Sequence, residues 1–169
     1  MSGAPPRAAA IAAVLLASAM AAHAGDWSRD GIGGCRIWNP HPQGNETSHW
    51  SGACVGGFAE GRGTVQWSVS NRVIESDEGN WSSGRQSGQG AQVWPTGRYD
   101  GELADGEPNG HGVLVSRGAR YEGDFRGGKP NGIGTLSQGG DTFRGVWSDG
   151  CFHDGARKIS FGVPLSECH

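Results

Sequence analysis

Tyr99-Asp-Gly101-Glu-Leu103-Ala-Asp-Gly106-Glu-Pro-Asn-Gly110-His-Gly112 returns 22 residues later as Tyr121-Glu-Gly123-Asp-Phe125-Arg-Gly-Gly128-Lys-Pro-Asn-Gly132-Ile-Gly134. Each copy has an aromatic residue, a glycine two positions later and a large apolar residue two positions after that. Glycines then follow seven, eleven and thirteen positions after the aromatic residue. Self-similarity at a fixed period of this size indicates a repeat architecture, so this stretch decides the fold.

The same template finds three further copies, which start at Trp50, Asp77 and Phe143. Asp77 replaces the leading aromatic residue of the second copy, and Cys54 replaces the large apolar residue of the first. The five start positions 50, 77, 99, 121 and 143 predict an insertion near residues 68–76, because the first spacing is the longest. We therefore expect five repeats over residues 50–154, flanked by cap segments at 25–49 and 155–169.

Each copy is predicted to form a β-hairpin. Tyr99, Gly101 and Leu103 alternate with polar residues, which is the period of a half-buried strand. Residues 105–110 have the composition of a turn, and residues 112–115 are expected to return as the second strand. Glycine weakens a strand, so we expect the ring of a neighbouring hairpin to lie across each strand glycine. A row of such hairpins can share one apolar face, whereas a single hairpin is only marginally stable.

Residues 1–24 have the composition of a secretory signal peptide. Arg7 precedes an apolar run at 8–22, and Ala22-His23-Ala24 is a small-residue cleavage site. The alternative is a membrane anchor, but the run is shorter than the roughly 20 residues that a span requires. We expect cleavage after Ala24 and a periplasmic or secreted protein.

Charge and motifs argue against several classes of function. After residues 1–24 the chain has 13 basic and 17 acidic residues, which gives no electrostatic reason to expect a nucleic-acid partner. The sequence contains none of the standard hydrolase, metalloprotease, phosphate-loop or calcium-loop motifs. We therefore expect no catalysis, no cofactor and no small-molecule substrate, with a small hydrolase kept as an alternative.

The four cysteines lie near the two ends of the repeat array. An even number of cysteines in an exported chain indicates disulfides, and four cysteines allow three pairings. We favour Cys35–Cys54 with Cys151–Cys168, because each bridge would tie a flanking segment over an open end of the sheet. The alternative is a metal site, since His153 and His169 accompany the C-terminal pair.

The repeat resembles the MORN (membrane occupation and recognition nexus) family, whose pattern is Tyr-x-Gly-x-Phe/Trp-x-x-Gly-x-x-x-Gly-x-Gly. The resemblance covers about residues 50–154. It implies an all-β fold, an elongated antiparallel meander of successive hairpins whose ends are here expected to be tied by disulfides. It also implies an interaction or scaffolding role, with catalysis in other domains where enzymes carry such repeats. The arrangement looks like that of small exported bacterial members of the family.

The leading functional hypothesis is an envelope scaffold that binds a protein partner of unknown identity through exposed aromatic residues on the sheet. The candidate aromatic residues are Trp50, Trp67, Trp81, Trp94, Tyr99, Tyr121, Phe125, Phe143 and Trp147. A peripheral phospholipid-binding module is the alternative. Against it, alternation places Asp100, Glu102, Glu122 and Asp124 on one side of the sheet, and their charges repel anionic headgroups. Basic residues at the strand ends would still allow a weak membrane contact at the edges of the sheet.

Overall fold

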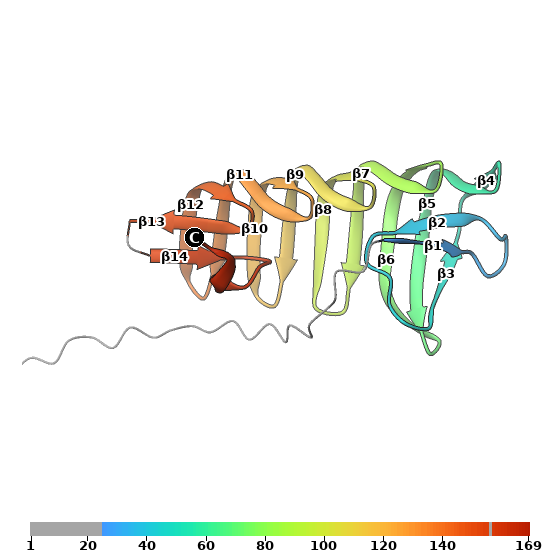
Figure 1. The fold of residues 1–169 in the computed structure, drawn as a ribbon, viewed down its shortest axis with the longest axis horizontal. Helices are drawn as coiled ribbons and strands as arrows, with labels where there is room; N and C mark the ends of the chain where they lie inside the picture. Colours follow the sequence, from blue (N-terminus) through green and yellow to red (C-terminus); the bar gives the residue numbers. More distant parts are fainter. Residues whose placement is uncertain (1–24, 156) are drawn as a thin grey trace, which may run out of the picture.

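The computed structural model describes residues 25–155 and 157–169 as one long, open β-sheet (Figure 1). Neighbouring strands of the repeats are antiparallel, so the expected meander of hairpins is confirmed. In this part of the chain no helix is long and apolar enough to cross a membrane. The expected signal peptide, residues 1–24, lies outside the described residues.

The sheet contains fourteen strands, ordered β1-β2-β5 and then β6 to β14 in sequence, with β3 and β4 both paired to β5. The strands are β1 (Asp26–Arg29), β2 (Arg36–Asn39), β3 (Glu46–Trp50), β4 (Ala53–Val55), β5 (Phe58–Val69), β6 (Arg72–Ser82), β7 (Arg85–Trp94), β8 (Gly97–Ala104), β9 (Glu107–Ser116), β10 (Ala119–Arg126), β11 (Lys129–Gln138), β12 (Asp141–Ser148), β13 (Cys151–Asp154) and β14 (Arg157–Ser160). The short 3-10 helix η1 (Leu165–Glu167) follows β14.

The strand glycines make room for the leading aromatic residue of their own hairpin. Gly101 faces Gly112 across the β8–β9 pair. A Cβ added at Gly112 would lie 2.6 Å from the ring atom Cε2 of Tyr99. The Tyr99 hydroxyl donates a hydrogen bond to the carbonyl of Glu102 at 2.8 Å. The ring thus lies along its own strand, and the expectation of a ring from a neighbouring hairpin was wrong.

Two other repeats have the same geometry. Tyr121 lies over Gly134 and donates to the carbonyl of Asp124 at 3.2 Å. Trp50 lies over Gly63, and its indole N–H donates to the carbonyl of Ala53 at 2.8 Å. In each of these repeats the hydrogen-bond acceptor is therefore the backbone carbonyl of the residue three positions after the aromatic residue.

Two-residue turns join the strands of each hairpin at one long edge of the sheet. We call Ser83-Gly84, Asp105-Gly106, Gly127-Gly128 and Asp149-Gly150 the tip turns; both central residues of each have positive φ, as a type I′ turn requires. The glycine N–H of each tip turn donates at 2.8–3.0 Å to a carbonyl of the preceding hairpin. These bonds link the hairpins in addition to the strand pairing.

The turn expected over residues 105–110 is shorter than predicted, because β9 already begins at Glu107. The pairing register shifts between Gly101 and Leu103, which face Gly112 and Pro108. The extra residues of β9 therefore form a bulge, and Gly110 supports it with a φ of 111°. The expected insertion near residues 68–76 lengthens β5 and β6, which meet at a Ser70-Asn71 turn.

The first and last described segments, β1–β2 and the residues from β13 onward, fold over the same face of the sheet, which we call the inner face (Figure 1). The β1–β2 hairpin covers the N-terminal part, where Ile37 packs with Val65 and Trp81. Beyond β14, Phe161 stacks on Tyr121 with 6.0 Å between ring centroids. Each cover also bonds to a tip turn: Trp38 N donates to Gly84 O at 2.7 Å, and Phe161 N donates to Gly150 O at 2.9 Å.

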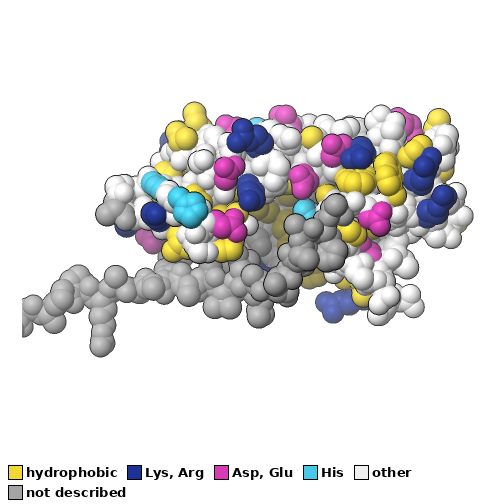
Figure 2. All heavy atoms as spheres, in the orientation of Figure 1, with side chains coloured by type: hydrophobic (Ala, Val, Ile, Leu, Met, Phe, Trp, Pro, Cys, Tyr) yellow, Lys and Arg dark blue, Asp and Glu magenta, His cyan; other side chains and the backbone are white. Residues whose placement is uncertain are grey.

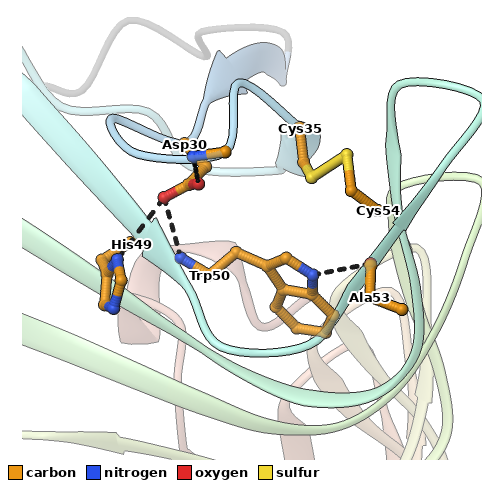
Figure 3. The surroundings of a disulfide bond; sticks show 7 residues. Asp30, Cys35, His49, Trp50, Ala53 and Cys54 are labelled. Carbon is orange, nitrogen blue, oxygen red and sulfur yellow. Dashed lines mark hydrogen bonds and ion pairs between the residues drawn. A yellow bond between two sulfur atoms is a disulfide. The ribbon is translucent and has the colours of Figure 1, made fainter.

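Asp30 and one disulfide fix the N-terminal cover (Figure 3). One carboxylate oxygen of Asp30 accepts the Trp50 N–H at 3.1 Å and lies 3.5 Å from His49 Nδ1, and the other accepts the Gly33 N–H. Burial by itself raises the pKa of Asp30, but these backbone donors outweigh it and hold the pKa below its usual value. Cys35 is bonded to Cys54 and Cys151 to Cys168, which is the pairing favoured from the sequence.

Replacing Cys151 and Cys168 together by serine is expected to lower the free energy of unfolding by about 2–3 kcal/mol, because the bridge joins residues 17 apart and so reduces the conformational entropy of the unfolded chain. Urea denaturation of the double variant and the wild type measures the difference. An unchanged midpoint would show that Phe161 and Val163 hold the C-terminal cover without the bridge.

Candidate interaction surface

Most of the aromatic residues expected on the surface are in the core. Tyr99 and Tyr121 are 1% and 0% exposed. The other buried members of the set are Trp50, Trp67, Trp81, Phe125 and Trp147. Trp94 and Phe143 are half-buried and pack against the buried cluster that contains Tyr99, Tyr121, Phe125 and Trp147. The expectation that these rows face solvent was therefore wrong for the buried seven, because their rings pack against one another between neighbouring repeats and, at Tyr121, against Phe161 of the C-terminal cover.

Three other aromatic residues form a cluster at the N-terminal end of the molecule. Trp27 of β1 is 39% exposed, and its ring centroid lies 5.4 Å from those of Trp38 and Phe58. The three rings come from β1, β2 and β5 and meet at the first tip turn. A Cβ at Gly84 would lie 2.8 Å from Trp27, so glycine allows this close approach.

Two arginines complete this cluster. The Arg36 guanidinium carbon lies 3.8 Å above the centroid of Phe58, and that of Arg85 lies 4.2 Å from the centroid of Trp38. Val55 is paired with Phe58 across the β4–β5 hairpin and is 59% exposed. We call Trp27, Trp38, Phe58, Val55, Arg36 and Arg85 the aromatic–arginine cluster. Figure 2 shows hydrophobic and basic side chains close together at this end of the molecule.

The cluster has the composition of a protein contact site. Tryptophan and arginine are enriched among the residues that dominate binding energy, and rigid rings lose little entropy on binding. Trp27 and Trp38 escaped the sequence analysis because they lie outside the repeat template. The alternation in Arg36-Ile37-Trp38-Asn39 could have indicated a strand with one buried and one partly exposed face.

The outer face, opposite the covers, carries both acidic and basic side chains, many of them in pairs. Asp100 pairs with Arg98, and Glu122 pairs with Arg120 at 2.7 Å. His111 Nδ1 lies 3.3 Å from Asp124. The carboxylates that were expected to repel anionic headgroups are thus largely matched by neighbouring bases. Ile133 and Val146 face each other across β11 and β12 as an exposed apolar pair.

One buried carboxyl, Asp77, and two half-buried ones, Glu75 and Glu46, lie near the N-terminal cover. Asp77, which replaces a repeat aromatic residue, is 5% exposed and accepts the Trp67 indole N–H at 2.6 Å. Glu75 lies beside it, and Glu46 accepts the Asn39 amide at 2.7 Å. Burial, followed by the negative charge of Glu46, raises the pKa of Glu75 to about 6. Burial and the charge of Glu75 raise the pKa of Asp77 well above its usual value.

The cysteine and histidine residues near the C terminus do not form a metal site. Both sulfurs are in the Cys151–Cys168 disulfide, while His153 and His169 line a shallow depression with Glu167. Within residues 25–155 and 157–169, no group of three or more His, Cys, Asp or Glu side chains is placed to hold a metal ion.

Comparison with known protein families agrees with this geometry. The MORN repeat family model matches residues 78–97, 99–117 and 121–142. No curated protein matches the chain significantly. MORN repeats are generally modules for protein or membrane interaction. The matched segments correspond to the hairpins β6–β7, β8–β9 and β10–β11, with the first residues of β12. Residues 78–142 of this chain therefore contain three MORN repeats.

Proposed function

We propose that this protein is an exported interaction module that binds a protein partner through the aromatic–arginine cluster. The observation that carries the proposal is the partly exposed Trp27, held edge-on between two rings at the end of a rigid sheet. A repeat sheet supplies a stiff support, and a preorganised aromatic contact needs little ordering on binding. The protein would act as a scaffold, with no catalysis of its own.

Export is supported by two features. Two disulfides tie the ends of the sheet, and disulfides persist mainly in oxidising compartments. Residues 1–24 have the composition of a signal peptide. Cell fractionation and sequencing of the mature N terminus test this part of the proposal. A mature chain that starts at Gly25 in the envelope or medium supports export, whereas an intact cytoplasmic chain contradicts it.

Site-specific photo-crosslinking tests the contact surface. A photoreactive amino acid at position 55, which leaves Trp27 and both arginines of the cluster in place, is expected to give a discrete protein adduct in the full-length, expressed protein. The same amino acid at the exposed outer-face position 115 serves as the matched control, because Val115 is 43% exposed. Adducts that are equal at both positions, or adducts with lipid alone, would contradict a protein contact at the cluster.

Trp27→Ala is expected to leave the fold intact and to abolish the adduct formed from position 55. We expect a loss of stability within the usual range for single substitutions, about 0.5–3 kcal/mol, because Trp27 contacts two rings but lies at the edge of the sheet and is 39% exposed. Thermal denaturation of the variant measures stability, and crosslinking from position 55 measures partner capture. A variant that unfolds would place Trp27 in the core; a stable variant with an undiminished adduct would move the contact to another surface.

A further inference from the structure

The guanidinium groups of the aromatic–arginine cluster keep their hydrogen-bond donors available. Stacking uses the flat face of a guanidinium, while its five N–H groups point outward in the plane. Arg36 lies over Phe58 and forms no ion pair with another described residue. Arg85 lies over Trp38 and is 3.4 Å from one oxygen of Asp105, a single contact at the surface. Both arginines can therefore accept a further anionic partner.

The apolar part of the cluster lies beside these donors. Arg85 is 5.3 Å from the ring centroid of Trp27, and Val55 is opposite Phe58. A partner that satisfies both arginines therefore also meets the exposed surfaces of Trp27 and Val55. The matching chemistry is a pair of carboxylates with a large apolar side chain between them.

We propose that the aromatic–arginine cluster binds an acidic protein segment in which an aromatic or aliphatic side chain lies between two carboxylates. This inference rests on the proposed function and names the class of partner. The carboxylates accept hydrogen bonds from Arg36 and Arg85 in the bidentate geometry that arginine favours. The apolar side chain packs on Trp27 and Val55 and excludes water from these bonds, which strengthens them.

Flanking carboxylates favour a narrow segment over an anionic membrane. Glu60 accepts the Ser83 N–H at 2.7 Å on one side of the first tip turn, and Asp105 lies beside Arg85 on the other. Asp26 is exposed directly before Trp27. A flat anionic bilayer would bring its charge against these acids as well as against the arginines. A single chain can place its carboxylates at the two arginines alone.

Binding of defined probes tests the proposal. The first probe is a labelled peptide with phenylalanine between two aspartates, and the second replaces both aspartates by asparagine. The third is a vesicle of phosphatidylglycerol. Fluorescence anisotropy and vesicle flotation with the mature protein measure binding. We expect the acidic peptide to bind, and its affinity to fall as the salt concentration increases, since screening reduces interactions between exposed charges.

Arg36→Gln and Arg85→Gln are each expected to lower the affinity for the acidic peptide about tenfold, which corresponds to the loss of one charge-assisted hydrogen bond. Arg120→Gln is the matched control, because Arg120 is an exposed strand arginine that pairs with Glu122 on the outer face. It should bind the peptide as the wild type does. Equal binding of the asparagine peptide, no binding of the acidic peptide, or equal effects of all three substitutions would overturn the assignment.

The same variants separate this assignment from the proposed function. If the position-55 adduct requires Trp27 but survives in both Arg36→Gln and Arg85→Gln, the contact surface stands and the acidic partner is wrong. If no protein adduct forms in the wild type, both are wrong. Flotation of vesicles that depends on Arg36, without peptide binding, would assign the cluster to lipid.

Discussion

Tyr121→Ala is expected to lower the free energy of unfolding by about 3–5 kcal/mol, the range for removing a buried aromatic side chain. Tyr121 is fully buried and contacts three rings, with centroids 5.0 Å away at Phe125, 5.3 Å at Trp147 and 6.0 Å at Phe161. The substitution removes the ring that joins the repeat sheet to the C-terminal cover. Urea denaturation at constant pH measures the change.

A glycine substitution tests the same packing from the opposite side. In Gly134→Ala the added Cβ would lie 2.7 Å from Cε2 of the Tyr121 ring, so either the ring or the strand must shift. Gly44→Ala is the matched control, because its Cβ would meet nothing within 4 Å and its φ is not positive. We expect destabilisation by about 1–3 kcal/mol for the first, as for other overpacked sites, and little change for the second. If Tyr121→Ala and Gly134→Ala both keep the wild-type midpoint, Tyr121 is a surface residue.

The protein is expected to lose stability as pH rises from about 5 to 8. The pKa of Glu75 is raised to about 6 in the folded state and that of Asp77 is raised further above its usual value. The folded protein thus holds protons that the unfolded chain releases above about pH 4, so stability falls as pH increases through the folded pKa values. We expect Glu75 to contribute a decrease on the order of 1 kcal/mol over this range, since one pKa unit corresponds to about 1.4 kcal/mol, and Asp77 to act in the same direction. Urea midpoints across this pH range measure it.

Asp77→Asn should flatten this dependence and make the protein more stable than the wild type at pH 8. The asparagine carbonyl can still accept the Trp67 indole N–H, and the group no longer ionises. Glu122→Gln is the control, because it removes an equal charge from an exposed pair with Arg120. Asp30 acts in the opposite direction at lower pH: its pKa is lowered, so its contribution is lost as pH falls through that lowered value. A wild-type stability that rises steadily from pH 5 to 8 would contradict the carboxyl assignment.

The repeat period was sufficient to predict where each hairpin lies along the chain and which glycines lie in its strands. Tyr99, Gly101 and Leu103 alternate as expected, and the 22-residue spacing places Tyr121 in the equivalent site of the next hairpin. The cysteine pairing also followed from position, because each pair lies at one end of the array. These features depend on local pattern, which the chain carries in every repeat.

The surface could not be predicted in this way. An isolated sheet would expose its aromatic face, so Tyr99 and Tyr121 were natural candidates for binding. The next repeat supplies one ring to each of them, Phe125 to Tyr99 and Trp147 to Tyr121, and the sequence analysis did not consider this contact. Phe161, which stacks on Tyr121, comes from a segment outside the repeats, and the repeat period does not encode that contact. The aromatic–arginine cluster assembles from β1, β2, β4, β5 and β7, whose contributing residues extend from Trp27 to Arg85.

The number of repeats between the first and the last tip turn sets the distance between the two ends of the molecule. Gly84 and Gly150 offer their carbonyls to the two covers in the same way, and the tip turns between them are spaced by 22 residues. Arg98-Tyr99 and Arg120-Tyr121 occupy equivalent positions in successive repeats. A chain without residues 99–120 would therefore join Arg98 to Tyr121 and keep the local sequence of the repeat. Adding or removing whole repeats would therefore change the distance between the two covers while leaving the contacts of each cover with its tip turn unchanged.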